Sequence, residues 1–131
     1  MNMRRKKVVI ADCNEKVLIA LEKILEEAGF DTTTVWTARE VLNLVDSKMF
    51  DLVLVNEYLP DAECEDLLKA LRTRGAQVPC IVMQPYTPEM VDITGLKALG
   101  ARSIVYKYAY QQIVELVREC LACDKKAPLV A

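Results

Sequence analysis

Short runs of apolar residues alternate along this chain with longer stretches in which apolar residues recur every three or four positions. Runs of the first kind predict strands at residues 7–11, 32–35, 52–55, 80–83 and 103–106. Stretches of the second kind predict helices at about residues 15–28, 38–47, 63–74, 88–99 and 110–123. Several of the strand runs are almost wholly apolar, which is typical of a parallel sheet covered on both faces.

The predicted helix boundaries carry residues that favour helix ends. Asn14 is a good N-cap for the first helix, and Gly29 is suited to ending it. In the segment 87–89, a threonine, a proline and a glutamate predict the start of the fourth helix, because proline fits the first turn and an acid suits the positive helix end.

Five strands that alternate with five helices predict a single doubly wound α/β domain. The expected sheet is parallel, with strand order 2-1-3-4-5. In such sheets, ligands bind at the carboxyl ends of the strands, near the point where the order reverses. This edge contains residues 12–14, 56–60, 84–86 and 106–110. The domain is expected to span residues 6–123, with a disordered tail or the start of a linker at 124–131.

Composition fits one globular domain and excludes several classes of partner. The chain has 131 residues, of which 53% are apolar and 27% charged, and none of its apolar runs approaches the roughly 20 residues needed to cross a bilayer. The net charge of −2 gives no strong field toward nucleic acid or membrane. The basic run at residues 4–7 is too short to predict a nucleic-acid site. We therefore expect neither partner.

The cysteines indicate a reducing compartment. There are five of them, an odd number without a secretory signal, which predicts free thiols in the cytoplasm. Cys120 and Cys123 have the spacing of a metal or redox pair, but the chain has no second such pair and no histidine. We interpret these two residues as packing residues of the last helix.

Five short motifs lie along the chain at or near the predicted strand ends. The chain carries Ala11-Asp12-Cys13-Asn14, then residues 56–60 (Asn-Glu-Tyr-Leu-Pro), then 83–85 (Met-Gln-Pro), then 100–101 (Gly-Ala) and 106–108 (Tyr-Lys-Tyr). In order and spacing these resemble the response-regulator receiver family over about residues 6–123. The resemblance implies a flavodoxin-like fold and a role in two-component signal transduction in the bacterial cytoplasm, with no catalytic activity and no cofactor.

The family's chemistry is not preserved in these motifs. The resemblance implies that two acids and a phosphoacceptor aspartate should hold Mg²⁺, but only Asp12 is an acid here, because Cys13 and Asn56 occupy the other two positions. Mg²⁺ prefers oxygen ligands, usually with one or two carboxylates, and a thiol is a poor ligand for it. An amide also cannot accept a phosphoryl group as a carboxylate does. We therefore predict neither a metal site nor phosphorylation at Asn56, although weak cation binding at Asp12 stays open.

Other positions that the resemblance assigns to the site have changed too. Gln84 stands where the family has threonine or serine, Ile104 stands at its aromatic switch, and Tyr108 replaces a proline. Lys107 is retained, and we predict that it forms an ion pair with Asp12; an anion-binding remnant is the alternative. Glu57 is expected to point away from the site, since successive strand residues face opposite sides.

All five tyrosines fall on loops or strand ends at this edge: Tyr58, Tyr86, Tyr106, Tyr108 and Tyr110. Tyrosine offers amphipathic contact area at low entropic cost, so the group predicts a contact surface. The equally weighted alternative is that the tyrosines cover turns and helix ends.

The leading functional interpretation is a pseudo-receiver, a protein-interaction module that signals without phosphorylation. Apolar residues extend far around the last helix, which suggests a homodimer through the fourth helix, fifth strand and fifth helix. A flavodoxin-like small-molecule binder is an alternative, although no phosphate-binding loop follows the first strand. A phosphoryl carrier or phosphatase based on Cys13 is a weaker alternative, because residue 19 is isoleucine where a phosphate-binding arginine would be needed.

Overall fold

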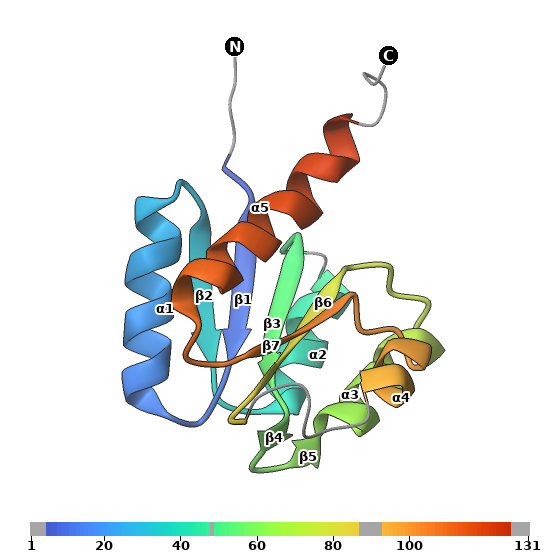
Figure 1. The fold of residues 1–131 in the computed structure, drawn as a ribbon. Coiled ribbons are helices and arrows are strands. Elements are labelled where there is room, and N and C mark those ends of the chain that lie inside the picture. Colours follow the sequence, from blue (N-terminus) through green and yellow to red (C-terminus); the bar gives the residue numbers. More distant parts are fainter. Residues whose placement is uncertain (1–4, 48, 87–92, 127–131) are drawn as a thin grey trace.

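A five-stranded parallel sheet forms the centre of the computed structural model, which describes residues 5–47, 49–86 and 93–126 (Figure 1). Its strands are β1 (Lys7–Ala11), β2 (Asp31–Val35), β3 (Leu52–Asn56), β6 (Cys80–Gln84) and β7 (Ser103–Tyr106). They are arranged in the order β2-β1-β3-β6-β7, with every pair parallel. This confirms the predicted fold class and strand order, because β6 and β7 are the fourth and fifth strands of the sheet.

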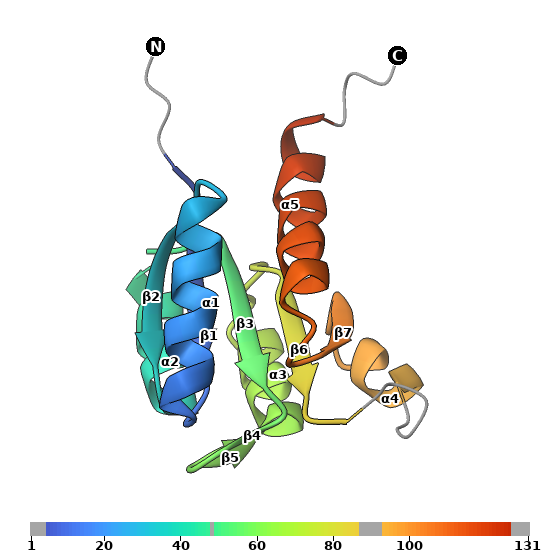
Figure 2. The same ribbon diagram turned by 60° about the vertical axis from the view of Figure 1, so that its left-hand side comes forward.

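Helices cover both faces of the sheet (Figure 2). On one face lie α1 (Glu15–Glu27) and α5 (Tyr110–Lys126), and on the other lie α2 (Ala38–Ser47), α3 (Cys64–Thr73) and α4 (Ile93–Ala98). Alternate residues of each strand enter opposite layers: Val8 and Ile10 of β1 pack with α1, whereas Val9 and Ala11 pack toward α2. The two apolar layers therefore follow directly from the pleat of the strands.

The ends of α1 confirm the predicted boundaries. The side chain of Asn14 accepts hydrogen bonds from the backbone N–H groups of Lys16 and Val17. Gly29, just beyond the helix, has a φ of 103°, a left-handed conformation that glycine adopts without a steric penalty. For α4, the predicted start at residues 87–89 lies outside the described residues.

The last helix departs from the prediction at its end and in its surroundings. α5 ends at Lys126 and not at Cys123, so its last turn includes residues predicted to belong to a tail. The large apolar side chains of residues 110–121 are already covered by α1 and the sheet, including Leu116, which is partly buried in the same layer. The wide apolar face of α5 therefore gives no argument for a homodimer, because the chain itself covers it. The buried residues of α5 are Ile113, Val114, Val117, Cys120 and Leu121.

A small hairpin that the sequence pattern did not predict follows β3. Its strands, β4 (Tyr58–Leu59) and β5 (Ala62–Glu63), pair antiparallel. At the turn, Asp61 accepts hydrogen bonds from the backbone N–H groups of Ala38 at 2.8 Å and Arg39 at 3.1 Å. The hairpin thus caps α2 with a carboxylate from 22 residues further along the chain.

No helix within the described part of the chain is long and apolar enough to cross a membrane.

Candidate functional site

Four buried polar side chains come from the carboxyl ends of four neighbouring strands: Asp12 after β1, Asn56 at the end of β3, Gln84 at the end of β6 and Lys107 after β7. The strand register aligns these ends, since Asn56 pairs with Met83 and Gln84 with Tyr106. The site therefore lies at the edge that the sequence predicted. Apolar strands and the helices that flank them enclose it, which explains the burial of its polar groups.

Asp12 and Lys107 form a buried ion pair. Asp12 Oδ2 lies 3.0 Å from Lys107 Nζ, and the side chain of Asp12 has 0% of its surface exposed. No donor among the described residues reaches Oδ2 in hydrogen-bonding geometry, so the contact with Lys107 is a charge–charge contact. Asp12 Oδ1 accepts a hydrogen bond from the backbone N–H of Asn14 at 2.9 Å. The predicted pairing is confirmed, and the charge of Lys107 is neutralised within the chain.

Asn56 uses its amide to hold the following loop. Its Nδ2 donates to the backbone carbonyl of Tyr58 at 2.7 Å, a bond that a carboxylate at this position could not donate. Its Oδ1 is buried and has no hydrogen-bond partner among the described residues. The amide nitrogen of Asn56 is therefore satisfied by the loop, while its amide oxygen is left without a partner among the described residues.

Gln84 is fully buried, and neither atom of its amide finds a partner in the described part of the chain. An unsatisfied buried amide costs roughly 1–3 kcal/mol. Its backbone carbonyl accepts from the N–H of Lys107 at 2.8 Å, which holds the ends of β6 and β7 together. Ile104, at the position of the family's aromatic switch, is half-buried against the apolar layer beneath α2, α3 and α4.

These groups do not fit the Mg²⁺ ion that the resemblance implies. The carboxylate of Asp12 is paired with an ammonium, and Asn56 offers only a neutral amide oxygen. Cys13 is exposed and carries a soft thiol at the place of a second acid. A magnesium ion would need at least one free carboxylate, and its charge would lie beside that of Lys107.

The five tyrosines separate into smaller groups in space. The rings of Tyr106 and Tyr108 meet edge to face with their centroids 5.5 Å apart, and Lys107 Nζ lies 5.7 Å from the Tyr108 ring centroid. Tyr110 begins α5 and packs partly buried against the core, as the turn-covering alternative predicted. Tyr58 is 50% exposed and lies with Tyr86 near Glu57.

The burial of Glu57 is a feature that the sequence interpretation missed. Its side chain is only 7% exposed, and its Oε1 accepts a hydrogen bond from the hydroxyl of Tyr86. This bond raises the pKa of Tyr86 well above its ordinary value. The regular pleat ends at Asn56, so strand alternation no longer governs the direction of the next side chain. One feature of the sequence could have drawn attention to Glu57: it is an acidic residue with no basic residue near it in the chain.

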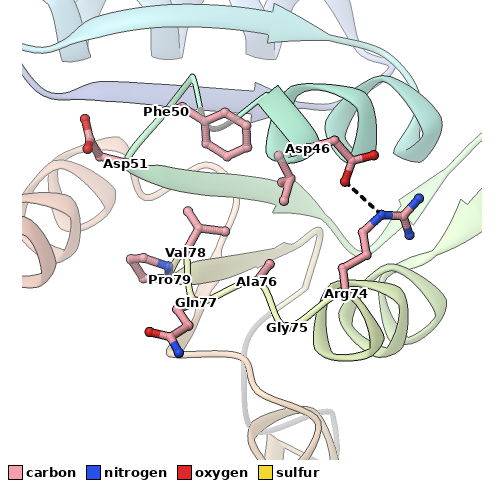
Figure 3. Close-up of a pocket in the computed structure, with 10 residues that line it drawn as sticks. Asp46, Phe50, Asp51, Arg74, Gly75, Ala76, Gln77, Val78 and Pro79 are labelled. Carbon is pink, nitrogen blue, oxygen red and sulfur yellow. Dashed lines mark hydrogen bonds and ion pairs between the residues drawn. The ribbon is translucent and has the colours of Figure 1, made fainter.

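Three surface pockets in the described part of the chain are lined by other residues than the tyrosines. One of about 620 Å³ opens at the amino ends of β3 and β6, at the opposite edge of the sheet, where Arg74 Nε lies 3.1 Å from Asp46 Oδ1 (Figure 3). Two others, of about 440 and 270 Å³, border α3. None of the three is lined by a tyrosine, so they do not support a ligand pocket at the tyrosine edge.

Comparison with known proteins identifies similar chains. The family model described as the response regulator receiver domain matches residues 8–118. Over 102 residues, the chain is 26% identical to the alkaline phosphatase synthesis transcriptional regulatory protein PhoP of Bacillus subtilis, covering 78% of this chain and 42% of that protein. Over 110 residues, it is 30% identical to the sensory/regulatory protein RpfC of Xanthomonas campestris, covering 80% of this chain and 15% of that protein. The chain thus spans less than half the length of either relative.

Solved structures have the same fold. A CheY-like response regulator receiver domain protein from Methanospirillum hungatei superimposes with a TM-score of 0.82 at 25% identity, covering 95% of this chain and 99% of that one. The signal receiver domain of a Luxo repressor protein from Vibrio parahaemolyticus gives 0.84 at 19% identity, covering 97% and 98%.

Proposed function

Because this chain belongs to the response regulator receiver domain family, we propose that it transmits signals through protein contacts without being phosphorylated at Asn56. Receiver domains are generally signalling modules and not enzymes. We propose that this chain works in the cytoplasm with a protein partner, and that neither nucleic acid nor a membrane is bound by this domain.

The observation that carries the proposal is the buried ion pair between Asp12 and Lys107. It uses the one acid of the site and the one retained lysine, so neither charge is available to a metal ion or a phosphoryl group. Asn56 supports the same conclusion, since its amide donates to the backbone of Tyr58 and offers no nucleophile. In this proposal the charges of the site neutralise each other, and its polar groups hold the neighbouring loops.

Incubation with acetyl phosphate and Mg²⁺, followed by intact mass spectrometry, tests the proposal. We expect no gain of a phosphoryl group by the unchanged chain. The Asn56→Asp variant, run in parallel, is also expected to remain unmodified, because Cys13 and Gln84 still leave the metal and phosphoryl sites incomplete. A stoichiometric, Mg²⁺-dependent phosphoryl gain by the unchanged chain would contradict the proposal.

The partner surface that we propose is the exposed part of the tyrosine edge, which the hairpin and the loop after β7 present to solvent. Tyr58 and Tyr108 are about half exposed, at 50% and 45%. Large exposed aromatic side chains are enriched where proteins meet. Asn56 donates to the backbone carbonyl of Tyr58, and Lys107 Nζ lies 5.7 Å from the Tyr108 ring centroid, so the altered site contacts both residues of this surface.

A further inference from the structure

Glu57 is a nearly buried carboxylate without a positive partner. None of the lysines and arginines whose side chains are described, in the ranges 5–47, 49–86 and 93–122, lies within ion-pair distance of it. The two described segments that border it, residues 57–68 and 84–86, contain five acidic residues, Glu57 among them, and no basic one. A buried charge normally needs a counter-charge, so the absence of one here leaves a position for a cation from outside.

Aromatic rings accompany this carboxylate. Tyr86 donates its hydroxyl to Glu57 Oε1, which leaves Oε2 without a hydrogen-bond donor among the described contacts. Tyr58, the next residue, is half exposed, and its pKa is raised chiefly by the charge of Glu57. Phenol rings near a carboxylate are a favourable environment for an organic cation, because the electrostatic attraction of a ring face adds to that of the acid.

Helix capping explains other acids nearby but not Glu57. Asp61 caps α2, and the side chain of Asp66 accepts from the backbone N–H of Glu63 at the start of α3. Glu57 bonds no helix end; its side chain bonds only Tyr86 within the described structure. The backbone of Glu57 is fixed at both ends, by Met83 and by Cys64, so the carboxylate is held rigidly in place.

We propose that Glu57, with Tyr58 and Tyr86, receives an arginine side chain from a partner protein. Guanidinium suits this site better than ammonium, since it is weakly hydrated, stacks on aromatic rings and pairs with carboxylates in a plane. Because Glu57 has so little exposed surface, a cation must lose water to reach it, and this costs less for the flat, weakly hydrated guanidinium than for ammonium. This inference rests on the proposed function, for which it names the chemistry of the partner.

A peptide titration of the ¹⁵N-labelled chain at low ionic strength tests the site. The probes are blocked Gly-Arg-Gly, Gly-Lys-Gly and Gly-citrulline-Gly, of which the last has the shape of arginine without its charge. For a single cationic contact, we expect saturable amide shifts around Glu57 and Tyr58 with a Kd on the order of 10 mM for the arginine peptide. The lysine peptide should bind about threefold more weakly, and the citrulline peptide should not saturate.

Variants then separate direct contact from general attraction. Glu57→Gln keeps the acceptor for Tyr86 and should abolish saturation, while Tyr58→Leu should raise the Kd about fivefold. Tyr86→Phe removes the competing donor and should lower the Kd about twofold. Glu65→Gln removes a neighbouring charge and should change the Kd by less than about twofold.

Three outcomes would overturn the inference: equal binding of the citrulline peptide, shifts centred elsewhere, or a Glu65→Gln effect as large as that of Glu57→Gln. Tyr58 is exposed, so its variant remains informative even if Glu57→Gln does not fold. Phosphorylation of the chain would contradict the proposed function without altering this titration, so the two failures can be told apart.

Discussion

The carboxylate of Asp12 and the ammonium of Lys107 lie 3.0 Å apart at the carboxyl ends of β1 and β7, almost wholly out of solvent. Each charge is tolerated there because of the other. Removing one partner of a buried pair leaves an uncompensated charge, which typically costs about 3–5 kcal/mol.

Lys107→Met should therefore lower the free energy of unfolding by about 3–5 kcal/mol, measured by urea denaturation at neutral pH. Its matched control is the double variant Asp12→Asn with Lys107→Met, in which neither charge remains. That variant should recover a large part of the loss. A loss below about 1 kcal/mol in the single variant would show that the pair is not desolvated in solution.

Gln84→Met should stabilise the chain. The methionine side chain has a similar length and needs no hydrogen-bond partner, whereas both polar atoms of the Gln84 amide are buried and have no partner among the described residues. Replacing such a group should raise the free energy of unfolding by about 1 kcal/mol, as seen in urea denaturation. A decrease of the same size would mean that an internal water satisfies the amide in solution. Met83→Leu, an apolar exchange one residue earlier in β6, gives the cost of repacking alone.

Asp61→Ala should weaken the start of α2 and make stability less sensitive to acid. The variant should lose about 1 kcal/mol at pH 7, since the backbone N–H groups of Ala38 and Arg39 lose their acceptor. These bonds outweigh desolvation and hold the pKa of Asp61 below its ordinary 3.8.

A lowered folded-state pKa means that the stabilisation is complete above the unfolded-state value and is lost as the pH falls through the folded-state value. The difference between the unchanged chain and Asp61→Ala should thus shrink below pH 3.8. Urea denaturation from neutral to acidic pH measures it, with Glu119→Ala on the exposed side of α5 as a control. A difference that stays constant into acid would contradict the capping role.

Iodoacetamide should distinguish the thiols by burial. Cys13 is exposed, whereas Cys64 and Cys80 are buried, and burial raises the pKa of Cys80 to about 12. Since the thiolate is the reactive form, native protein should label at Cys13 and not at Cys64 or Cys80, as peptide mapping by mass spectrometry would reveal. Labelling of Cys13 tenfold faster than that of a free small thiol would instead favour the nucleophile alternative.

The sequence by itself determined the architecture and the residues at the site. Apolar runs and amphipathic stretches predicted the sheet strands, and their alternation with right-handed crossovers predicted a doubly wound parallel sheet, because both depend on short-range periodicity and chain chirality. That arrangement brought Asp12 and Lys107 to one edge, and the need of a buried charge for a partner predicted their ion pair.

Only the tertiary structure decided how side chains beyond the strands are used. The hairpin after β3 has strands too short to give an alternating pattern, and its Asp61 caps a helix that precedes it in the chain. The sequence could not show whether the apolar side of α5 packs against this chain or against a second copy, and in the structure it packs against the chain's own core. Glu57 follows the last paired residue of β3, where the pleat stops fixing direction, so its burial beside Tyr86 depends on contacts between distant loops.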